Sequence, residues 1–425
     1  MDNLLHWIWL SLSVNPGGES FKKLYERFGS VGEIYSADEA MLASVIGSRS
    51  RDFKSLLDKD LERAQCVLDF CLTKSVGILV YEDEKYPENL RKIKNPPVLL
   101  YYRGTLPDFK KALCISVVGS RSVTEYGMKN AFTVSRDLAK SGATIVSGMA
   151  IGIDGVALAG ALSEEMPTVA VIGSGIDVCY PPQHKRLARE IVKRGCVMTE
   201  YPPATPPVKI NFPTRNRIIS GLSEAVLVIE GREKSGSVIT ARKAFSQGRT
   251  VYALPGNVDR KNSESTNLLI KNGARAFTSA DDIIRDFEAS HAGKLNPFKL
   301  LSPSSKSLSS VLSEYEVAAL SQGDGVFIPS GIKPKREKTL KKAPKTVAEL
   351  SFDNAGLDTA ELDKKLSKLD APLRALYEKI PQGKSISQES LVSEELPMRE
   401  LMRALLKLEV AGLIAMLPGE RLKRN

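Results

Sequence analysis

Between residues 113 and 288, short apolar runs alternate with longer stretches of helical pattern. The runs are nearly continuous, which is typical of parallel strands that are buried on both faces. The strands that we expect are 113–118, 143–147, 168–172, 197–200, 225–230 and 250–253. Helices are expected between them, among others at 127–140, 154–163 and 183–194. This alternation predicts an α/β fold with an extended, Rossmann-like, doubly wound and mostly parallel sheet.

Small residues stand at the ends of these strands. Glycine and serine recur at 119–120, 147–148, 173–175 and 235–237. In an open parallel sheet, ligands lie outside the carboxyl ends of the strands. Small residues there allow backbone N–H groups to face an anion. The pattern therefore predicts a bound phosphate chain, with a plain βα turn at Arg121 and a helix cap at Ser235 as the structural alternatives.

One stretch between two of the strands combines an aromatic side chain with cations. Lys209 and Phe212 precede the triplet Arg215-Asn216-Arg217. Phe212 could stack on an unpaired base, worth ~1–3 kcal/mol per base, while the cations follow the backbone. Pro213 would begin a helix and place both arginines near its positive end. The alternative is that Phe212 belongs to the core and Asn216 satisfies local backbone. The whole cluster favours a nucleic-acid strand as the ligand.

Several other site classes find little support. Neither G-x-G-x-x-G nor G-x-x-x-x-G-K-[ST] occurs, which argues against a dinucleotide enzyme and an ordinary ATPase. The five cysteines form no Cys-x-x-Cys pair, and only three histidines are present. A disulfide framework, a metal site and histidine-based catalysis therefore have few candidate residues. We expect no catalytic residue, no metal and no cofactor.

Charge and hydropathy point to a basic protein away from membranes. The net charge of +10 favours an anionic partner. Part of the excess lies in a basic run at 333–342 that resembles a solvated linker, and part lies within the glycine-rich region. No apolar run reaches the ~20 residues that span a bilayer, and the N-terminus lacks the basic start of a signal peptide. We expect a cytoplasmic protein with no membrane partner.

The chain divides into four parts. Residues 1–75 show helical spacing and predict a small domain that resembles SAM or helix-hairpin-helix units, or a plain helical cap. Residues 76–288 form the Rossmann-like domain. Residues 289–366 are serine-rich and then basic, which predicts a flexible linker with one short helix near 313–321. Residues 367–425 predict three helices and a hairpin, a winged-helix pattern that binds DNA or only a protein.

The motifs, taken in order, resemble those of the bacterial DNA-processing protein A (DprA/Smf) family. The matching elements include Tyr86-Pro87, Gly119-Ser120-Arg121, the loop 147–154, Tyr180-Pro181, the run 212–223 and Ser235-Gly236-Ser237. The resemblance covers 76 to about 287 and implies a single-stranded DNA-binding protein of natural transformation. It also implies a homodimer that helps to load the RecA recombinase and that has no accepted catalytic activity.

The resemblance and the strand-end loops together give the candidate DNA-binding residues. Carried over by motif are Gly119, Ser120, Arg121, Lys209, Phe212, Arg215 and Asn216, with Lys185 as a weaker member. The loops and the basic cluster add Ser147, Gly148, Arg217, Ser235 and Gly236. Two positions depart from the family pattern, namely Leu158, where histidine is common, and Ser265, where glycine is expected.

Two rival functions remain open. A Rossmann-like nucleotide or phosphoribose hydrolase would need a Pro-Gly-Gly-x-Gly-Thr loop followed by a glutamate, and residues 235–241 offer no carboxylate. A protein-interaction hub would use the linker and the winged helix for recruitment. Nucleotide turnover distinguishes the first rival from DNA binding, and DNA-independent partner binding distinguishes the second.

Overall fold

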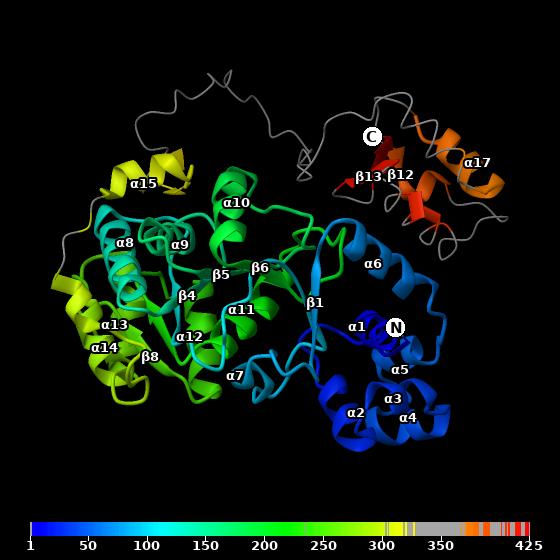
Figure 1. The fold of residues 1–425 in the computed structure, drawn as a ribbon, viewed down its shortest axis with the longest axis horizontal. Helices are drawn as coiled ribbons and strands as arrows, with labels where there is room; N and C mark the ends of the chain where they lie inside the picture. The colour runs from blue at the N-terminus through cyan, green and yellow to red at the C-terminus, as the bar shows by residue number, and fades with distance from the viewer. Residues whose placement is uncertain are drawn as a thin grey trace.

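The computed structural model describes residues 2–301 except Lys234, most of 304–320, residues 326–327 and parts of 367–424. Figure 1 shows a helical N-terminal part, a central sheet covered by helices and a small C-terminal part. Among the described residues, no helix is long and apolar enough to cross a membrane. No group of three or more His, Cys, Asp or Glu side chains in that part of the chain is arranged to hold a metal ion.

Six short helices form the N-terminal part, as the spacing of apolar residues predicts. They are α1 (Asp2–Ser13), α2 (Ser20–Phe28), α3 (Val31–Ser36), α4 (Glu39–Ile46), α5 (Arg51–Leu56) and α6 (Glu62–Thr73). Polar side chains cap three of them, because Ser30, Asp38 and Ser50 each accept a hydrogen bond from a first-turn N–H group. Trp7 and Leu24 are buried in a core that continues into the sheet.

The central sheet has nine strands in the order β1-β2-β6-β5-β4-β3-β7-β8-β9. Their bounds are β1 (Gly77–Val80), β2 (Leu99–Gly104), β3 (Cys114–Val118), β4 (Thr144–Ser147), β5 (Thr168–Val171), β6 (Cys196–Thr199), β7 (Ala225–Val228), β8 (Thr250–Ala253) and β9 (Arg275–Ala276). All strands from β6 to β9 in this order pair in parallel, whereas β2 pairs antiparallel with β1 and β6. The predicted mostly parallel sheet is confirmed.

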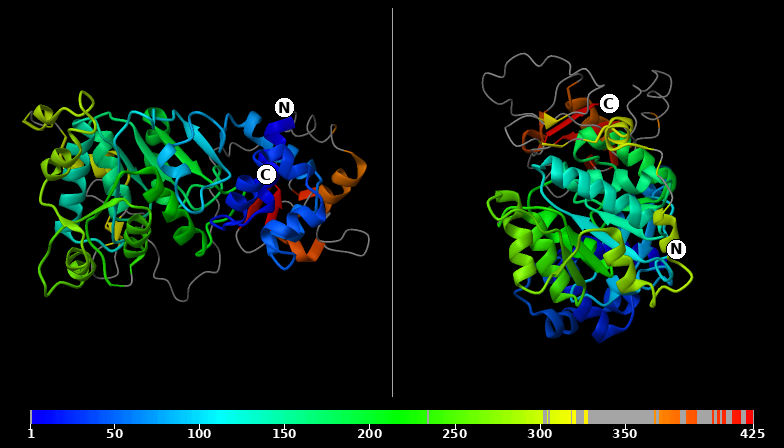
Figure 2. Two further views of the ribbon diagram at one scale, coloured as in Figure 1. Left: turned by 90° about the horizontal axis from the view of Figure 1, so that it is seen from below. Right: turned by 90° about the vertical axis from the view of Figure 1, so that its left-hand side faces the viewer.

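Helices cover both faces of this sheet (Figures 1 and 2). One apolar cluster joins the sheet to α8 (Glu125–Lys140), α9 (Ile153–Ser163), α10 (Lys185–Arg194) and α14 (Ala280–Phe287). A second cluster joins it to α7 (Glu88–Arg91), α11 (Asn211–Leu222), α12 (Gly236–Ser246) and α13 (Glu264–Lys271). The strand order reverses between β3 and β7, so the loops that follow these strands open a crevice at the carboxyl edge.

The N-terminal helices pack against the β1 end of the sheet. Helix α6 contacts β1, and α1 contacts β2. Tyr101 of β2 and Trp7 of α1 are buried in one continuous apolar cluster. Figure 1 shows α1 and α6 beside β1, at the end of the sheet opposite β8.

Part of the predicted linker is packed on the domain. Residues 297–301 form a short 3-10 helix, η3 (Pro297–Leu301), and α15 (Leu308–Glu314) follows with Ser307 as its cap. Val311, Leu312 and Tyr315 are buried in the cluster that contains α9. The observed helix begins five residues earlier in the chain than the predicted 313–321, because the apolar side chains at 311–315 pack against the cluster that contains α9. Two short strands, β10 (Ala319–Leu320) and β11 (Val326–Phe327), pair beyond it. Residues 289–296 are also described, whereas residues 328–366 lie outside the described part of the chain.

The described C-terminal elements fit the predicted winged-helix pattern. They are α17 (Ala371–Lys379), β12 (Ile386–Ser387), the 3-10 turn η4 (Gln388–Leu391), β13 (Ile414–Leu417) and β14 (Arg421–Arg424). The sheet order is β12-β14-β13, and β13 and β14 form the wing. Leu401, Leu405 and Leu408 are buried beside Tyr377. Of the helix predicted at 398–411, residues 401, 404, 405, 407 and 408 are described.

Candidate nucleic-acid interface

The loops after β3 and β4 lie directly against each other. The N–H of Ile153 donates to the carbonyl oxygen of Ser120 at 3.1 Å. A Cβ atom on Gly119 would lie 2.6 Å from Ile153 Cγ1, and one on Gly152 would lie 2.4 Å from the Ser120 oxygen. Gly152 also has a positive φ of 90°. These glycines are required for close packing between the loops.

The hydroxyl of Ser120 is used within its own turn. It donates to the carbonyl oxygen of Ser122 at 2.6 Å and accepts from the Ser122 N–H at 3.1 Å. Ser120 therefore shapes the turn that presents Arg121. The side chain of Arg121 is exposed at the end of this turn.

An arginine and two aromatic rings meet at the carboxyl edge of the sheet. The Arg121 guanidinium carbon lies 5.5 Å from the centroid of the Phe212 ring. The Tyr180 ring lies 5.5 Å from the same ring, tilted by 44°. Gly173 supports Phe212 from the β5 loop, since a Cβ atom there would lie 3.2 Å from Phe212 Cδ1. These groups line a cavity of about 30 Å³.

Phe212 is half-buried at the start of α11. It is not a member of either apolar cluster of the Rossmann-like domain. The ring is thus held by its neighbours but keeps exposed surface beside Arg121. This placement fits a stacking platform better than a core side chain.

Arg215 lies beneath the glycine loop that follows β4. Its side chain is buried, and Nη1 donates to the carbonyl oxygen of Gly148 at 2.8 Å and to that of Val171. Asp154 lies on the same side, because a Cβ atom on Gly148 would meet both Arg215 and Asp154 at 2.5 Å. Burial lowers the pKa of Arg215 to about 10, and the charge of Asp154 opposes this shift. Arg215 therefore positions the loop and adds positive charge behind it.

Two further candidate residues also have buried side chains. Arg217 is 2% exposed and pairs with the buried carboxylate of Glu200. Burial raises the pKa of Glu200, and the charge of Arg217 opposes this effect. Ser147 is fully buried, and its hydroxyl donates to the carbonyl oxygen of Val117 at 2.6 Å. These side chains stabilise the interior, so we leave Arg217 and Ser147 out of the proposed contact surface.

The other candidates lie on or next to α10, α11 and α12. Lys209 is exposed just before α11, and Lys185 is half-buried at the start of α10. The Asn216 amide donates to the carbonyl oxygen of Gly236 at 3.4 Å, which links α11 to the start of α12. Ser235 shares a hydrogen bond with the Ser237 hydroxyl at 2.7 Å and makes no side-chain cap bond within the described residues. Ser235 therefore occupies the N-cap position of α12 but does not cap the helix through its side chain.

Tyr180 and Gly173 contact Phe212 in this site but are not among the candidate DNA-binding residues predicted from the sequence. Tyr180-Pro181 appears in the sequence only as a family motif, and Gly173 only as a small strand-end residue. Both follow β5, which lies next to β4 in the sheet. An aromatic residue shortly after a predicted parallel strand was the available signal for Tyr180.

The two departures from the family pattern are both interior positions. Leu158 is fully buried in α9, where an apolar side chain fits the packing. Ser265 is also buried, and its backbone N–H donates to the carbonyl oxygen of Gly231 at 3.1 Å. Among the described residues, neither Leu158 nor Ser265 forms a hydrogen bond with Arg121 or Phe212.

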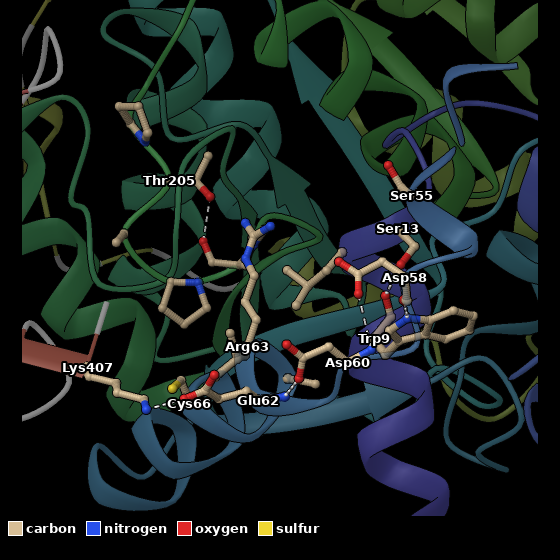
Figure 3. Close-up of a pocket in the computed structure, with 17 residues that line it drawn as sticks. Trp9, Ser13, Ser55, Asp58, Asp60, Glu62, Arg63, Cys66, Thr205 and Lys407 are labelled. Carbon is tan, nitrogen blue, oxygen red and sulfur yellow. Dashed lines mark hydrogen bonds and ion pairs between the residues drawn. The ribbon is translucent and has the colours of Figure 1, made fainter. Parts of the chain in front are cut away.

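A separate cavity of about 470 Å³ lies between the N-terminal helices and residues 202–206 (Figure 3). Glu62 and Lys407 form an ion pair at one side of it and connect α6 to the C-terminal part. Asp58, Asp60 and Glu62 line this cavity, and among the described lining residues none is a candidate DNA-binding residue. Arg63 and Lys407 line it as well, so its charged side chains are of both signs.

Known proteins resemble this chain in sequence and structure. A family model described as DNA recombination-mediator protein A matches residues 77–288. The DNA processing protein DprA of Bacillus subtilis is 37% identical over 225 residues, which cover 53% of this chain and 76% of that protein. Protein Smf of Escherichia coli is 34% identical over 284 residues, which cover 63% of this chain and 75% of that protein.

A solved structure agrees with these relatives. The X-ray structure of DNA processing protein A from Streptococcus pneumoniae superposes with a TM-score of 0.59 at 35% sequence identity. The match covers 66% of this chain and 96% of that chain. The resemblance of the motifs is therefore confirmed, and the chain belongs to the DNA recombination-mediator protein A family, the family of the DNA-processing proteins DprA and Smf.

Proposed function

We propose that this protein binds single-stranded DNA at the carboxyl edge of its sheet, where the loops after β3, β4 and β5 meet the start of α11. The observation that carries the proposal is the pairing of exposed Arg121 with the half-buried rings of Phe212 and Tyr180. A nearby guanidinium and a supported aromatic face are the two groups that a single strand needs. Membership of a DNA-processing family supports the same conclusion.

In this proposal one aromatic residue contacts a base of the DNA, and the cationic residues contact its phosphates. The Phe212 ring stacks on an unpaired base, and Arg121 donates its forked hydrogen bonds to a phosphate. Gly119 and Gly148 let the loops after β3 and β4 pack closely against Ile153 and Arg215, and Arg215 holds the carbonyl group of Gly148, which fixes the edge that the strand crosses. Lys185 and Lys209 contact phosphates on either side. The start of α12 at Ser235 and Gly236, joined to Asn216, extends the surface.

Binding should weaken steeply as salt is added. Contacts from Arg121, Lys185 and Lys209 neutralise phosphates and release counterions, so log K should fall with log salt with a slope of about −2 for a single strand. A fluorescence-anisotropy titration of a labelled thymidine oligonucleotide at increasing NaCl concentrations measures this slope. A slope near zero would mean that these cations do not contact phosphates.

We further propose that the protein acts as a cytoplasmic homodimer that helps to load the RecA recombinase during natural transformation. Family membership supports these roles. Apolar side chains on α12 and α13 support the dimer, because Ile239, Phe245 and Leu268 are 37–40% exposed on helices that pack over the same face of the sheet. Sedimentation over a range of protein concentrations tests the dimer, and a strand-exchange assay with RecA tests the loading.

Neither rival function gains a specific observation. Asp154 and Glu200 are buried against Arg215 and Arg217, so neither carboxylate is presented to a nucleotide as a catalytic group. In the interaction-hub alternative, the linker and the winged helix would bind the partners. Most of the residues in these two segments lie outside the part that the structure describes. DNA binding therefore stays the proposed function.

A further inference from the structure

A cavity of about 1240 Å³, which we call the Tyr126 cavity, lies beside the proposed DNA interface. Its walls are the first turn of α8, the residues that follow β7 and β8, and one side of α15. The turn after β3 borders both places, because Arg121 lines the small cavity at Phe212 and Val123 lines the Tyr126 cavity. Arg121 and Tyr126 are close in the chain, and the residues between them span at most about 18 Å. At ~3.4 Å per stacked nucleotide, this distance corresponds to roughly five nucleotides.

Tyr126 supplies an aromatic face to this cavity. Its side chain lines the cavity and is 50% exposed, although it lies in the first turn of a packed helix. The hydroxyl donates to the carbonyl oxygen of Pro255 at 2.8 Å, which fixes the edge of the ring against the loop after β8. A ring that is held at its edge and exposed elsewhere is suited to stack on an unpaired base.

The loop that holds Tyr126 is itself fixed in place. The Asn267 amide nitrogen donates to the carbonyl oxygen of Gly256 at 2.9 Å, and its oxygen accepts from the Gly256 N–H at 3.3 Å. A Cβ atom on Gly256 would lie 2.3 Å from the Ser263 hydroxyl oxygen, so the loop packs closely on the start of α13. Because these contacts exist without a ligand, little ordering of the loop is needed when a base binds.

Arg260 supplies a cation at the rim of the same cavity. Its side chain is 70% exposed and pairs with the neighbouring Asp259 at 3.9 Å. Such an exposed ion pair contributes little, so the guanidinium can exchange it for a phosphate.

Two carboxylates also line the cavity and decide which part of a nucleotide enters it. Glu230 is buried, and its oxygens accept from the N–H and the hydroxyl of Thr124 at 2.9 and 2.8 Å. Glu125 is exposed beside Tyr126. Because these groups repel a phosphate, the uncharged base enters the cavity and the phosphate stays at Arg260.

We propose that the Tyr126 cavity is a second base-binding site for the single strand, with a base stacked on Tyr126 and the adjoining phosphate at Arg260. This inference rests on the proposed function and extends the path of the strand across the turn after β3. The pairing of an aromatic ring with an arginine repeats that of Phe212 and Arg121 on the other side of this turn. Apolar side chains of Leu254 and Leu312 complete a surface that can cover a base.

A length series of thymidine strands tests this second site. Strands of about 4 to about 16 nucleotides, the range of site sizes of OB-fold single-strand binders, are titrated by fluorescence anisotropy. Tyr126→Ala should bind the shortest strands like wild type and lose about five-fold or more in affinity for the longest, because these alone reach the second ring. Tyr126→Phe is the matched control and should follow wild type at every length, since it keeps the ring. A thermal melt checks that each variant is folded.

Arg260→Ala tests the phosphate contact independently of the ring. For the longest strand the salt slope should become shallower by about 0.7, whereas the slope for the shortest strand should not change. Arg285→Ala is the control, because Arg285 is an exposed arginine of α14 that also pairs with a nearby aspartate and does not line the cavity. An equal change of slope in both variants would overturn the contact at Arg260.

The outcomes distinguish the second site from the first. The inference is overturned if Tyr126→Ala follows wild type at every length, if it weakens binding by the same factor at every length, or if Tyr126→Phe shares its loss. Phe212→Ala should instead weaken binding at every length. Wild-type binding by Phe212→Ala would contradict the first site and leave a length-dependent loss in Tyr126→Ala standing. Failure of the wild-type protein to bind any strand would contradict the proposed DNA function and the second site with it.

Discussion

Phe212→Ala is expected to weaken binding of a single strand by about 1–3 kcal/mol, roughly 5-fold to 150-fold, with little change in the salt slope. The physical reason is that stacking on the ring is lost while the phosphate contacts stay. The ring is half-buried and is supported by Gly173 and Tyr180, and its exposed part lies beside the Arg121 guanidinium. Anisotropy titration at several salt concentrations measures both the affinity and the slope.

A thermal melt of the same variant separates stacking from core packing. A fully buried phenylalanine would cost about 3–5 kcal/mol of stability when replaced by alanine, and the half-buried ring should cost clearly less. Phe298→Ala is the control, because this ring is 79% exposed on η3, away from the interface. If Phe212→Ala melts far below wild type yet binds normally when folded, the ring is structural and the stacking role is lost.

Arg121→Ala is the second large effect that we expect. Losing one charge-assisted hydrogen-bond donor to a phosphate should reduce affinity by about 1.5–3 kcal/mol, and the salt slope should become shallower by about 0.7. Folding should not suffer, because the side chain is exposed. The same titration and melt measure these quantities.

Two comparison variants sharpen the Arg121 result. Arg121→Lys keeps the charge but loses the forked donor, so it should recover the salt slope and only part of the affinity. Arg51→Ala removes an exposed arginine at the start of α5 and should leave DNA binding unchanged. Equal losses in Arg51→Ala and Arg121→Ala would show that only overall charge matters, and that the turn after β3 is not a specific contact.

The sheet was predictable because its signals are local. Six apolar runs and the small residues after them are visible in the sequence, and each strand lies within two residues of its expected bounds. Parallel strands end at one edge, so the meeting of Gly119, Gly148 and Phe212 at that edge followed from the fold class. The packed helix α15 was placed too late in the chain, because its partner surface on α9 lies far away in sequence.

The burial of individual side chains was not predictable, because it depends on remote partners. Arg215 and Arg217 look equivalent in the sequence, as two cations that flank Asn216. In the structure, Arg215 donates a hydrogen bond to the carbonyl group of Gly148, which follows β4. Arg217 forms an ion pair with Glu200, which follows β6. A buried cation is tolerated only with such partners. No local pattern around 212–217 reveals them.

The central claim is that the ring of Phe212 and the guanidinium of Arg121 bind an unpaired strand. Its most direct measurement compares the affinity of the wild-type protein for a single-stranded oligonucleotide with that for the blunt duplex of the same sequence at one salt concentration. The account predicts that the single strand binds roughly ten-fold or more tightly, because stacking on Phe212 needs an unpaired base. Equal affinity for the two forms would contradict it.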